Sequence, residues 1–212
     1  MAKILRILPA LLLSTSINAQ QVLFSEDFEG AQHGFTLNTS DMGSQTSGAN
    51  TWLVNNAYTG GSSTLDCLGI PFTFTIPNTA AQPAGITQPN GKYMHITSNA
   101  AMASGIANCN FAAADGLCTA AGNHFARMTT DVATTGADEV ALSFWWLCAG
   151  SASNYGEVYY STNGGTSWNQ VTTPLSNYAN QPGWVQQTIT LPAFADQATL
   201  RFGFRFVNGT TM

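Results

Sequence analysis

Two adjacent strand-like segments in the second half of the chain constrain its fold more than any other feature. Val140–Cys148 is a run of mostly apolar and aromatic residues, and Glu157–Ser161 is rich in strand-favouring types. Asn163-Gly164 follows the second segment and favours the positive φ angles of a tight turn, after which the chain resumes at Trp168. The pattern predicts two strands and a hairpin of a β-sandwich.

Further strand-like runs recur along the chain between turn residues, and no segment after residue 19 has the spacing of an amphipathic helix. Thr199–Val207 places an apolar residue at every second position, which is typical of a strand with one buried face. The sequence therefore predicts an all-β fold. The expected strands are Val22–Phe28, Trp52–Asn55, Tyr93–Thr97, Phe125–Thr130, Val140–Leu147, Glu157–Ser161, Trp184–Leu191 and Thr199–Val207.

The first 19 residues have the layout of a secretory signal peptide: a basic start, an apolar centre and Ala19 at the expected cleavage point. The apolar run Ile7–Leu13 is shorter than the roughly 20 residues of a membrane span, so no span is expected. Without residues 1–19 the chain keeps 4 basic and 11 acidic residues, a net charge of −7. This acidity disfavours a nucleic-acid partner, because binding to phosphates needs a basic surface.

Four cysteines follow the signal peptide, and in an exported protein they indicate disulfides. Three pairings are possible. The compact spacing favours a bond between Cys109 and Cys118, which leaves Cys67 to pair with Cys148. On this interpretation the stretches 58–89 and 98–123 are long loops stapled to the sandwich.

A series of short motifs, in this order, resembles the MAM-like and related jelly-roll adhesion domains of secreted Bacteroidetes-type surface proteins. The resemblance covers most of residues 20–212 and implies one domain, a two-sheet antiparallel jelly-roll sandwich of the concanavalin-like kind. The motifs are Glu26–Gly30, Gly34-Phe35, Thr51–Val54, Gly91–Ile96, Ala126–Met128, Leu142–Trp146, Gly156–Tyr160, Gly183-Trp184 and Leu200–Phe204.

The resemblance also implies a closing strand with an Ile-Asp-Asp type motif, and this chain stops at Met212 without one. We therefore expect the closing strand, and further domains, to follow in a longer protein. Related folds use a carboxylate near the first strand as a calcium ligand. This implies a structural calcium site at Asp27 and Glu29, completed by a further acid such as Asp41. The alternative is a solvated strand end.

Several aromatic residues beside loops or on polar faces are candidates for stacking on sugar rings. They are Tyr58, Tyr155, Tyr178 and Trp184. Ser161–Trp168 also resembles the Asp-box of sialidases, with Asn163 in the acid position, and that box is a folding element away from the active site. It predicts that Trp168 packs over the turn.

No enzyme motif stands out, because the three histidines lack zinc-protease spacing and no Gly-x-Ser-x-Gly is present. The sequence thus predicts a secreted or cell-surface, non-catalytic module that binds a cell-surface glycan or protein in adhesion. One alternative is an accessory N-terminal domain of a larger secreted hydrolase. Another is a structural surface or filament subunit that assembles by strand complementation.

Overall fold

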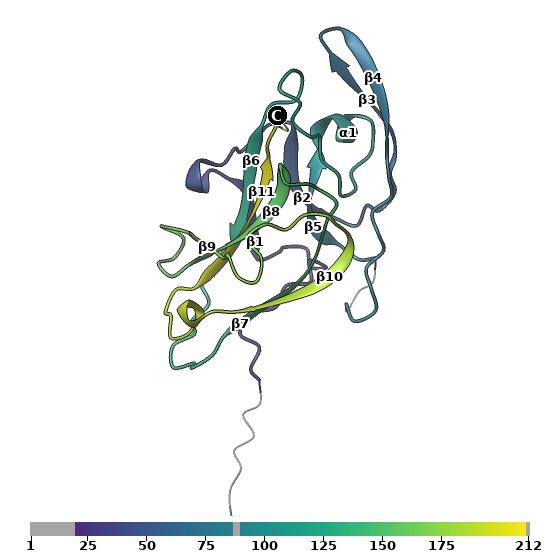
Figure 1. Ribbon diagram of the computed structural model, residues 1–212. Helices are drawn as coiled ribbons and strands as arrows, with labels where there is room; N and C mark the ends of the chain where they lie inside the picture. Colours follow the sequence, from purple (N-terminus) through teal and green to yellow (C-terminus); the bar gives the residue numbers. More distant parts are fainter. Residues whose placement is uncertain (1–19, 87–89, 211–212) are drawn as a thin grey trace, which may run out of the picture.

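The computed structural model describes residues 20–86 and 90–210, and the expected signal peptide lies outside them. Antiparallel strands dominate this part of the chain (Figure 1). The strands are β1 (Phe35–Thr39), β2 (Asn50–Asn55), β3 (Gly61–Cys67), β4 (Ile70–Ile76), β5 (Tyr93–Ser98), β6 (Gly122–Met128), β7 (Ala141–Cys148), β8 (Asn154–Ser161), β9 (Asn169–Gln170), β10 (Gln181–Thr190) and β11 (Arg201–Asn208). The helices are α1 (Asn99–Ala103) and the 3₁₀ turns η1 (Asp41–Gly43) and η2 (Pro192–Phe194).

The largest sheet has five strands in the order β1-β6-β11-β8-β9. β11 lies at its centre and pairs antiparallel with both β6 and β8. Phe202 and Phe206 of β11 are buried, as the alternating pattern predicts. The sequence therefore identified this strand and its buried face, and the structure adds that the strand is central.

β7 and β10 form a separate antiparallel ribbon whose apolar side chains pack against the five-stranded sheet. Ile189 of β10 and Phe194 of η2 are fully buried there. Leu142, Phe144 and Trp146 of β7 pack against the same core. The buried members of this core are Met128, Val158, Val171, Tyr178, Ile189, Phe194, Leu200 and Phe202.

Phe125 of β6 occupies a second fully buried position, on the side of the sheet where Tyr159 and Trp168 lie. Its ring meets those two rings edge to face, with centroids 5.8 Å and 5.0 Å away. Gly203 of β11 lies beneath the ring, and a β-carbon on this glycine would collide with it. The glycine is therefore needed for close approach, a common reason for glycine within a strand.

The turn between β8 and β9 has the structure that the Asp-box pattern predicts. The Ser161 hydroxyl donates to Asn163 Oδ1 at 2.8 Å and accepts from the Gly165 amide at 2.9 Å. Asn163 Oδ1 also accepts from the Ser167 amide at 3.0 Å. Trp168 packs beside Gly165, so its predicted place over the turn is confirmed.

Two expectations about local structure were wrong. Residues 61–76, expected to be part of a loop, form the long β3–β4 hairpin that projects from the body (Figure 1). Residues 22–28, expected to be a strand, join no ladder, and Val22 is 74% exposed. Phe24 and Phe28 instead pack against Phe35, so aromatic contacts hold the segment without strand pairing.

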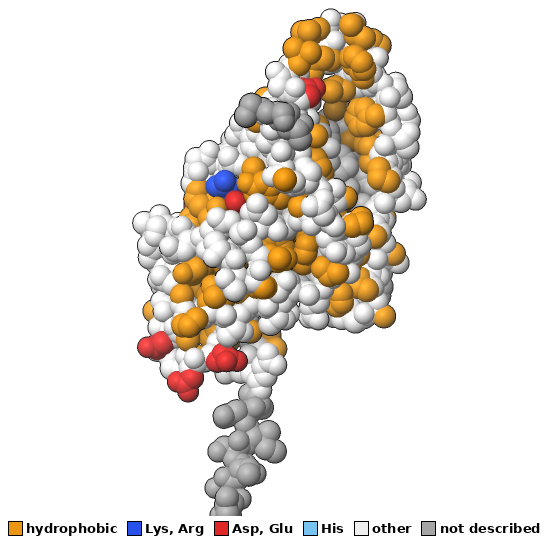
Figure 2. All heavy atoms as spheres, in the orientation of Figure 1, with side chains coloured by type: hydrophobic (Ala, Val, Ile, Leu, Met, Phe, Trp, Pro, Cys, Tyr) orange, Lys and Arg blue, Asp and Glu red, His pale blue; other side chains and the backbone are white. Residues whose placement is uncertain are grey.

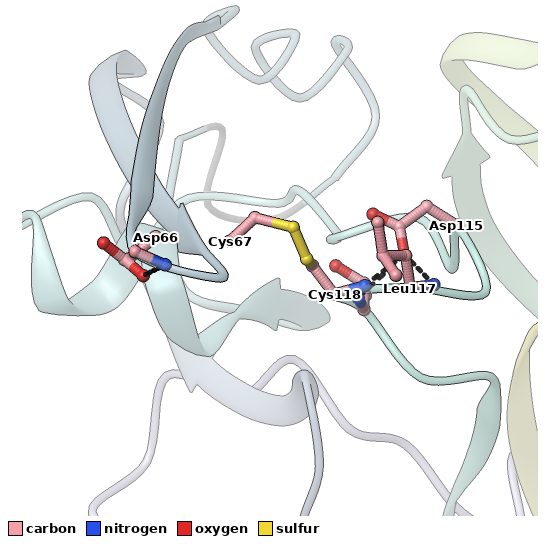
Figure 3. The surroundings of a disulfide bond; sticks show 7 residues. Asp66, Cys67, Asp115, Leu117 and Cys118 are labelled. Atoms are coloured by element: carbon pink, nitrogen blue, oxygen red, sulfur yellow. Dashed lines mark hydrogen bonds between the residues drawn. A yellow bond between two sulfur atoms is a disulfide. The ribbon is translucent and has the colours of Figure 1, made fainter.

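The expected cysteine pairing was also wrong, because the disulfide joins Cys67 to Cys118 (Figure 3). The β3–β4 hairpin carries Cys67 to its tip, beside a turn in which Asp115 Oδ1 accepts from the amides of Leu117, Cys118 and Thr119. This turn points Cys118 toward the hairpin, and their Cα atoms are 5.4 Å apart, an ordinary disulfide spacing.

Within the residues that the structure describes, no helix is long and apolar enough to cross a membrane.

Candidate functional site

The residues that the structure describes form a large groove with a volume of 1230 Å³. One wall is the five-stranded sheet, with Val158, Phe204 and Phe206 among its residues. The other walls are strands β5 and β7, which are not hydrogen-bonded to each other. The groove therefore lies between strands that belong to two separate two-stranded sheets.

A smaller cavity of 230 Å³ shows that β5 and β7 flank a gap. Tyr93 and Met94 of β5 line one side of this cavity, and Ser143 and Trp145 of β7 line the other. The N-terminal segment 20–28 also lines the two hollows without joining either strand. No ladder thus bridges β5 and β7 among the residues described.

Strand β7 presents a free backbone edge. In the described part of the chain it pairs only with β10, and no loop backbone group bonds to residues 141–147. The outer edge of β5 is partly occupied by Asn110. The backbone amide of Asn110 donates to the Ile96 carbonyl, and its side-chain oxygen accepts a hydrogen bond from the Ser98 amide. The free edge beside the groove is therefore mainly that of β7.

The charged groups at the groove are mostly acidic. Asp138 and Glu139 are exposed at its end, just before β7. Glu157 is buried, and its Oε2 lies 3.0 Å from Arg205 Nε and accepts a hydrogen bond from the Tyr159 hydroxyl. Because Glu157 is held by Arg205, Tyr159 and Gln170, it serves as a buried ion-pair partner.

Sequence reasoning missed most of this groove. Two of the predicted ligand residues, Tyr178 and Trp184, line it, whereas Met94, Phe144 and Trp146, which line it as well, were not chosen as candidates. The signal was present in the alternation of Leu142, Phe144 and Trp146, which indicates a buried face. That alternation does not show that the face borders an open hollow.

The four aromatic residues predicted to bind sugar do not form one platform. Tyr178 is only 4% exposed and packs edge to face on Trp146 with ring centroids 4.8 Å apart, so its prediction as a free stacking surface was wrong. The physical reason is that its backbone bridges to Gly156, which draws the loop residue into the core. Burial raises the pKa of the Tyr178 hydroxyl to about 12.

Tyr58 and Trp184 do come together, through the ring of Tyr93. Their ring centroids lie 4.9 Å and 5.7 Å from that of Tyr93. The Tyr58 hydroxyl donates to the Gly91 carbonyl and the Trp184 indole donates to the Ala80 carbonyl, which ties both side chains to loops. Tyr155 lies apart, on β8 opposite Val207.

The three predicted calcium ligands are not gathered into one site. Asp41 is 3.0 Å from Arg127 Nε and accepts from the Trp168 indole, while Glu29 accepts from the Lys92 amide. Burial would raise the pKa of Asp41, but hydrogen bonds and the charge of Arg127 outweigh it and lower the pKa. No group of three or more His, Cys, Asp or Glu residues suited to a metal occurs in the described ranges. These carboxylates therefore do not fit the calcium site implied by the resemblance.

His95 of β5 lies on the groove wall and is almost wholly buried. Its ring stacks on Tyr93 with centroids 4.4 Å apart, and Nε2 lies 3.0 Å from Asn55 Oδ1. Burial lowers its pKa to about 4, against the opposing effect of a hydrogen bond to the Ile96 carbonyl. The folded protein therefore holds this imidazole neutral.

This burial predicts a loss of stability in mild acid. The unfolded chain takes up a proton at His95 near pH 6.5, whereas the folded chain resists it down to about pH 4. The free energy of unfolding should therefore fall as the pH drops from 6.5 to about 4, by about 2–3 kcal/mol. Urea unfolding across this range should show a smaller fall for His95→Gln than for the wild type. His33→Gln is the control, and an equal fall in all three proteins would contradict the assignment.

Comparison with known proteins gives no family for this chain. No protein-family model matches it, and a search of curated proteins found no match.

Proposed function

We propose that the chain is a secreted or cell-surface, non-catalytic binding module of the jelly-roll class, and that its ligand is an extended segment of another protein. The observation that carries the proposal is the apolar groove of 1230 Å³ beside the free edge of β7. The signal-like residues 1–19 support export.

The walls of the groove suit a strand with apolar residues at every second position. Backbone groups on the β7 edge can pair with an added strand, while partly exposed apolar side chains such as Met94 receive its apolar face. β7 is eight residues long, so it can pair with a segment of similar length. Asp138 and Glu139 at the end of the groove favour a ligand with a basic flank.

Protein is favoured over glycan because three of the four aromatic residues predicted to stack on sugar are buried or tied to loops, and the fourth, Tyr155, lies apart from them on β8. Tyr178 lies in the core, and Tyr58 and Trp184 use their polar atoms on backbone carbonyls. A sugar site instead needs an open aromatic face with free polar groups around it. We therefore propose that the module adheres by binding a protein segment and not a glycan.

A second candidate is a structural subunit that assembles with copies of itself. The projecting hairpin favours it, because Ile70, Phe72 and Phe74 on one face of β4 are 58%, 53% and 39% exposed. Figure 2 shows hydrophobic side chains gathered over this projection. Exposed apolar strands of this kind are common at protein interfaces.

The probe for the proposed function is a fluorescent peptide of alternating valine and threonine with lysines at both ends. We expect it to bind, by fluorescence anisotropy, and we expect Met94→Asp to weaken binding at least about tenfold. Met94 lines both hollows and is partly exposed, so a charge there opposes an apolar ligand. Gln186→Asp, on an exposed position of β10 outside the groove, is the matched control and should bind like the wild type.

Other outcomes would overturn the proposal in distinct ways. If Met94→Asp and Gln186→Asp bind the peptide equally well, the groove is not the binding site. Binding on a glycan array, without binding of the peptide, would assign a carbohydrate ligand. Concentration-dependent oligomers that Phe72→Ser abolishes and Thr73→Ser leaves intact would assign the structural role, because these neighbouring residues lie on opposite faces of β4.

A further inference from the structure

Two of the four cysteines are not in the disulfide already described. They are Cys109, in the segment after α1, and Cys148, the last residue of β7. Cys67 and Cys118 are bonded to each other, so these two are the remaining thiols of the chain. Both are partly buried and both line the groove, although 38 residues separate them in the sequence.

The surroundings fix each thiol in place. The Cys109 amide donates to the Thr79 hydroxyl at 3.1 Å and to the Tyr93 hydroxyl at 3.2 Å, which anchors it beside β5. Cys148 pairs with Gln181 in the β7–β10 ribbon, and its Sγ lies close to Gly150. The segment that holds Cys109 and the ribbon that holds Cys148 therefore meet at the groove, where Tyr93 already contacts Trp184.

The surroundings of both thiols also disfavour the charged thiolate form. Burial raises the pKa of the Cys109 thiol to about 12, and a negative charge on Cys148 adds to the effect. Burial likewise raises the pKa of Cys148, against hydrogen bonds from Gly150 and Gly156. Two thiols with raised pKa values, in apolar surroundings, lack the thiolate character of a reactive or catalytic cysteine.

We propose that Cys109 and Cys148 form a second disulfide, which ties the segment after α1 to the end of β7 across the groove. The oxidant is another disulfide, carried either by a small molecule such as oxidised glutathione or by an oxidoreductase. During folding, before the two thiols are buried, one cysteine thiolate attacks this disulfide and forms a mixed disulfide, and the second thiolate then displaces the reduced thiol. The protein loses two protons and two electrons, and the oxidant becomes two thiols.

The bond has a structural consequence that the first disulfide does not share. Cys67–Cys118 joins the projecting hairpin to a neighbouring turn, whereas Cys109–Cys148 would join the two sides of the groove. It would therefore set the separation between the β5 side and the β7 ribbon at this end. The proposal stands whether or not the groove binds a protein segment.

The test begins from fully reduced, unfolded chain, which is refolded in a mixture of reduced and oxidised glutathione. Remaining thiols are then alkylated in denaturant, and the protein is digested and mapped by mass spectrometry. Trypsin alone is unsuitable, because Cys109 and Cys118 share one tryptic peptide between Lys92 and Arg127. A second protease that cleaves at Asp115 separates them.

We expect no alkylated cysteine and a cross-linked peptide pair that contains Cys109 and Cys148. In Cys148→Ser, Cys109 should be alkylated in full while Cys67–Cys118 persists. In the matched variant Cys67→Ser/Cys118→Ser, the Cys109–Cys148 peptide pair should remain. Alkylation of Cys109 and Cys148 in refolded wild type, or a bond from either to Cys67 or Cys118, would overturn the proposal. Neither result depends on ligand binding, so it leaves the proposed function to its own test.

Discussion

Replacing Phe125 with alanine is expected to lower the free energy of unfolding by about 3–5 kcal/mol. The Phe125 ring is fully buried and contacts Tyr159 and Trp168, so its removal leaves a cavity that the flanking strands cannot fill. Urea unfolding followed by circular dichroism would measure the change. Phe72→Ala is the matched control, because Phe72 is 53% exposed on the projecting hairpin and its loss should cost less than about 0.5 kcal/mol.

Gly203 provides a second test of the same packing. A methyl group at this position collides with the Phe125 ring, and such overpacking typically costs about 1–3 kcal/mol. In the double variant Phe125→Ala/Gly203→Ala the ring is absent and the methyl group has room. The double variant should therefore lose less stability than the sum of the losses in the two single variants. Strict additivity would mean that the ring and the glycine do not contact each other.

Loss of the Cys67–Cys118 disulfide is the other large effect that we expect. The bond closes a loop with a sequence separation of 51, and removal of a disulfide of this kind typically costs about 2–4 kcal/mol. The double variant Cys67→Ser/Cys118→Ser should lose that much stability in urea unfolding and gain rapid amide exchange across β3 and β4. Its exchange in β8 and β11 should stay slow, because these strands lie in the central sheet and not in the hairpin.

A control separates the covalent bond from the side chains. Because a reductant would also break a bond between Cys109 and Cys148, the control is made in the variant Cys109→Ser/Cys148→Ser, whose stability the reductant should lower by about 2–4 kcal/mol. If the double variant were as stable as the oxidised protein, the hairpin would be held by its own ladder and the disulfide would add nothing.

The sequence predicted strands well where burial alternates. Leu200, Phe202 and Phe206 mark the inner face of the central strand, and the structure buries all three. The same pattern located β10, and strand-favouring residue types located β7 and β8, all to within a few residues. Alternating segments are predictable because one face meets the core and the other does not, which leaves a period of two in the residue types.

The remaining features depend on contacts between distant residues. β4 does alternate, with Ile70, Phe72 and Phe74 on one face, but its partner β3 lies in a Gly-, Ser- and Thr-rich stretch without an apolar pattern, so the sequence gave no clear sign of a hairpin. The disulfide followed from that hairpin, because the hairpin brings Cys67 to Cys118. Tyr178 was predicted to be exposed because its neighbours in the sequence are typical of a loop. A backbone bridge to Gly156, distant in the sequence, instead buries it.

The hairpin and its disulfide also determine what a protease would leave behind. Leu68 and Gly69 form the exposed tip of the projection, where a cut is sterically easiest. A cut there divides the chain between Cys67 on one side and Cys118 on the other, and the bond between them keeps the two pieces together. The nicked molecule would retain its strands and separate into fragments only when unfolded in the presence of a reductant.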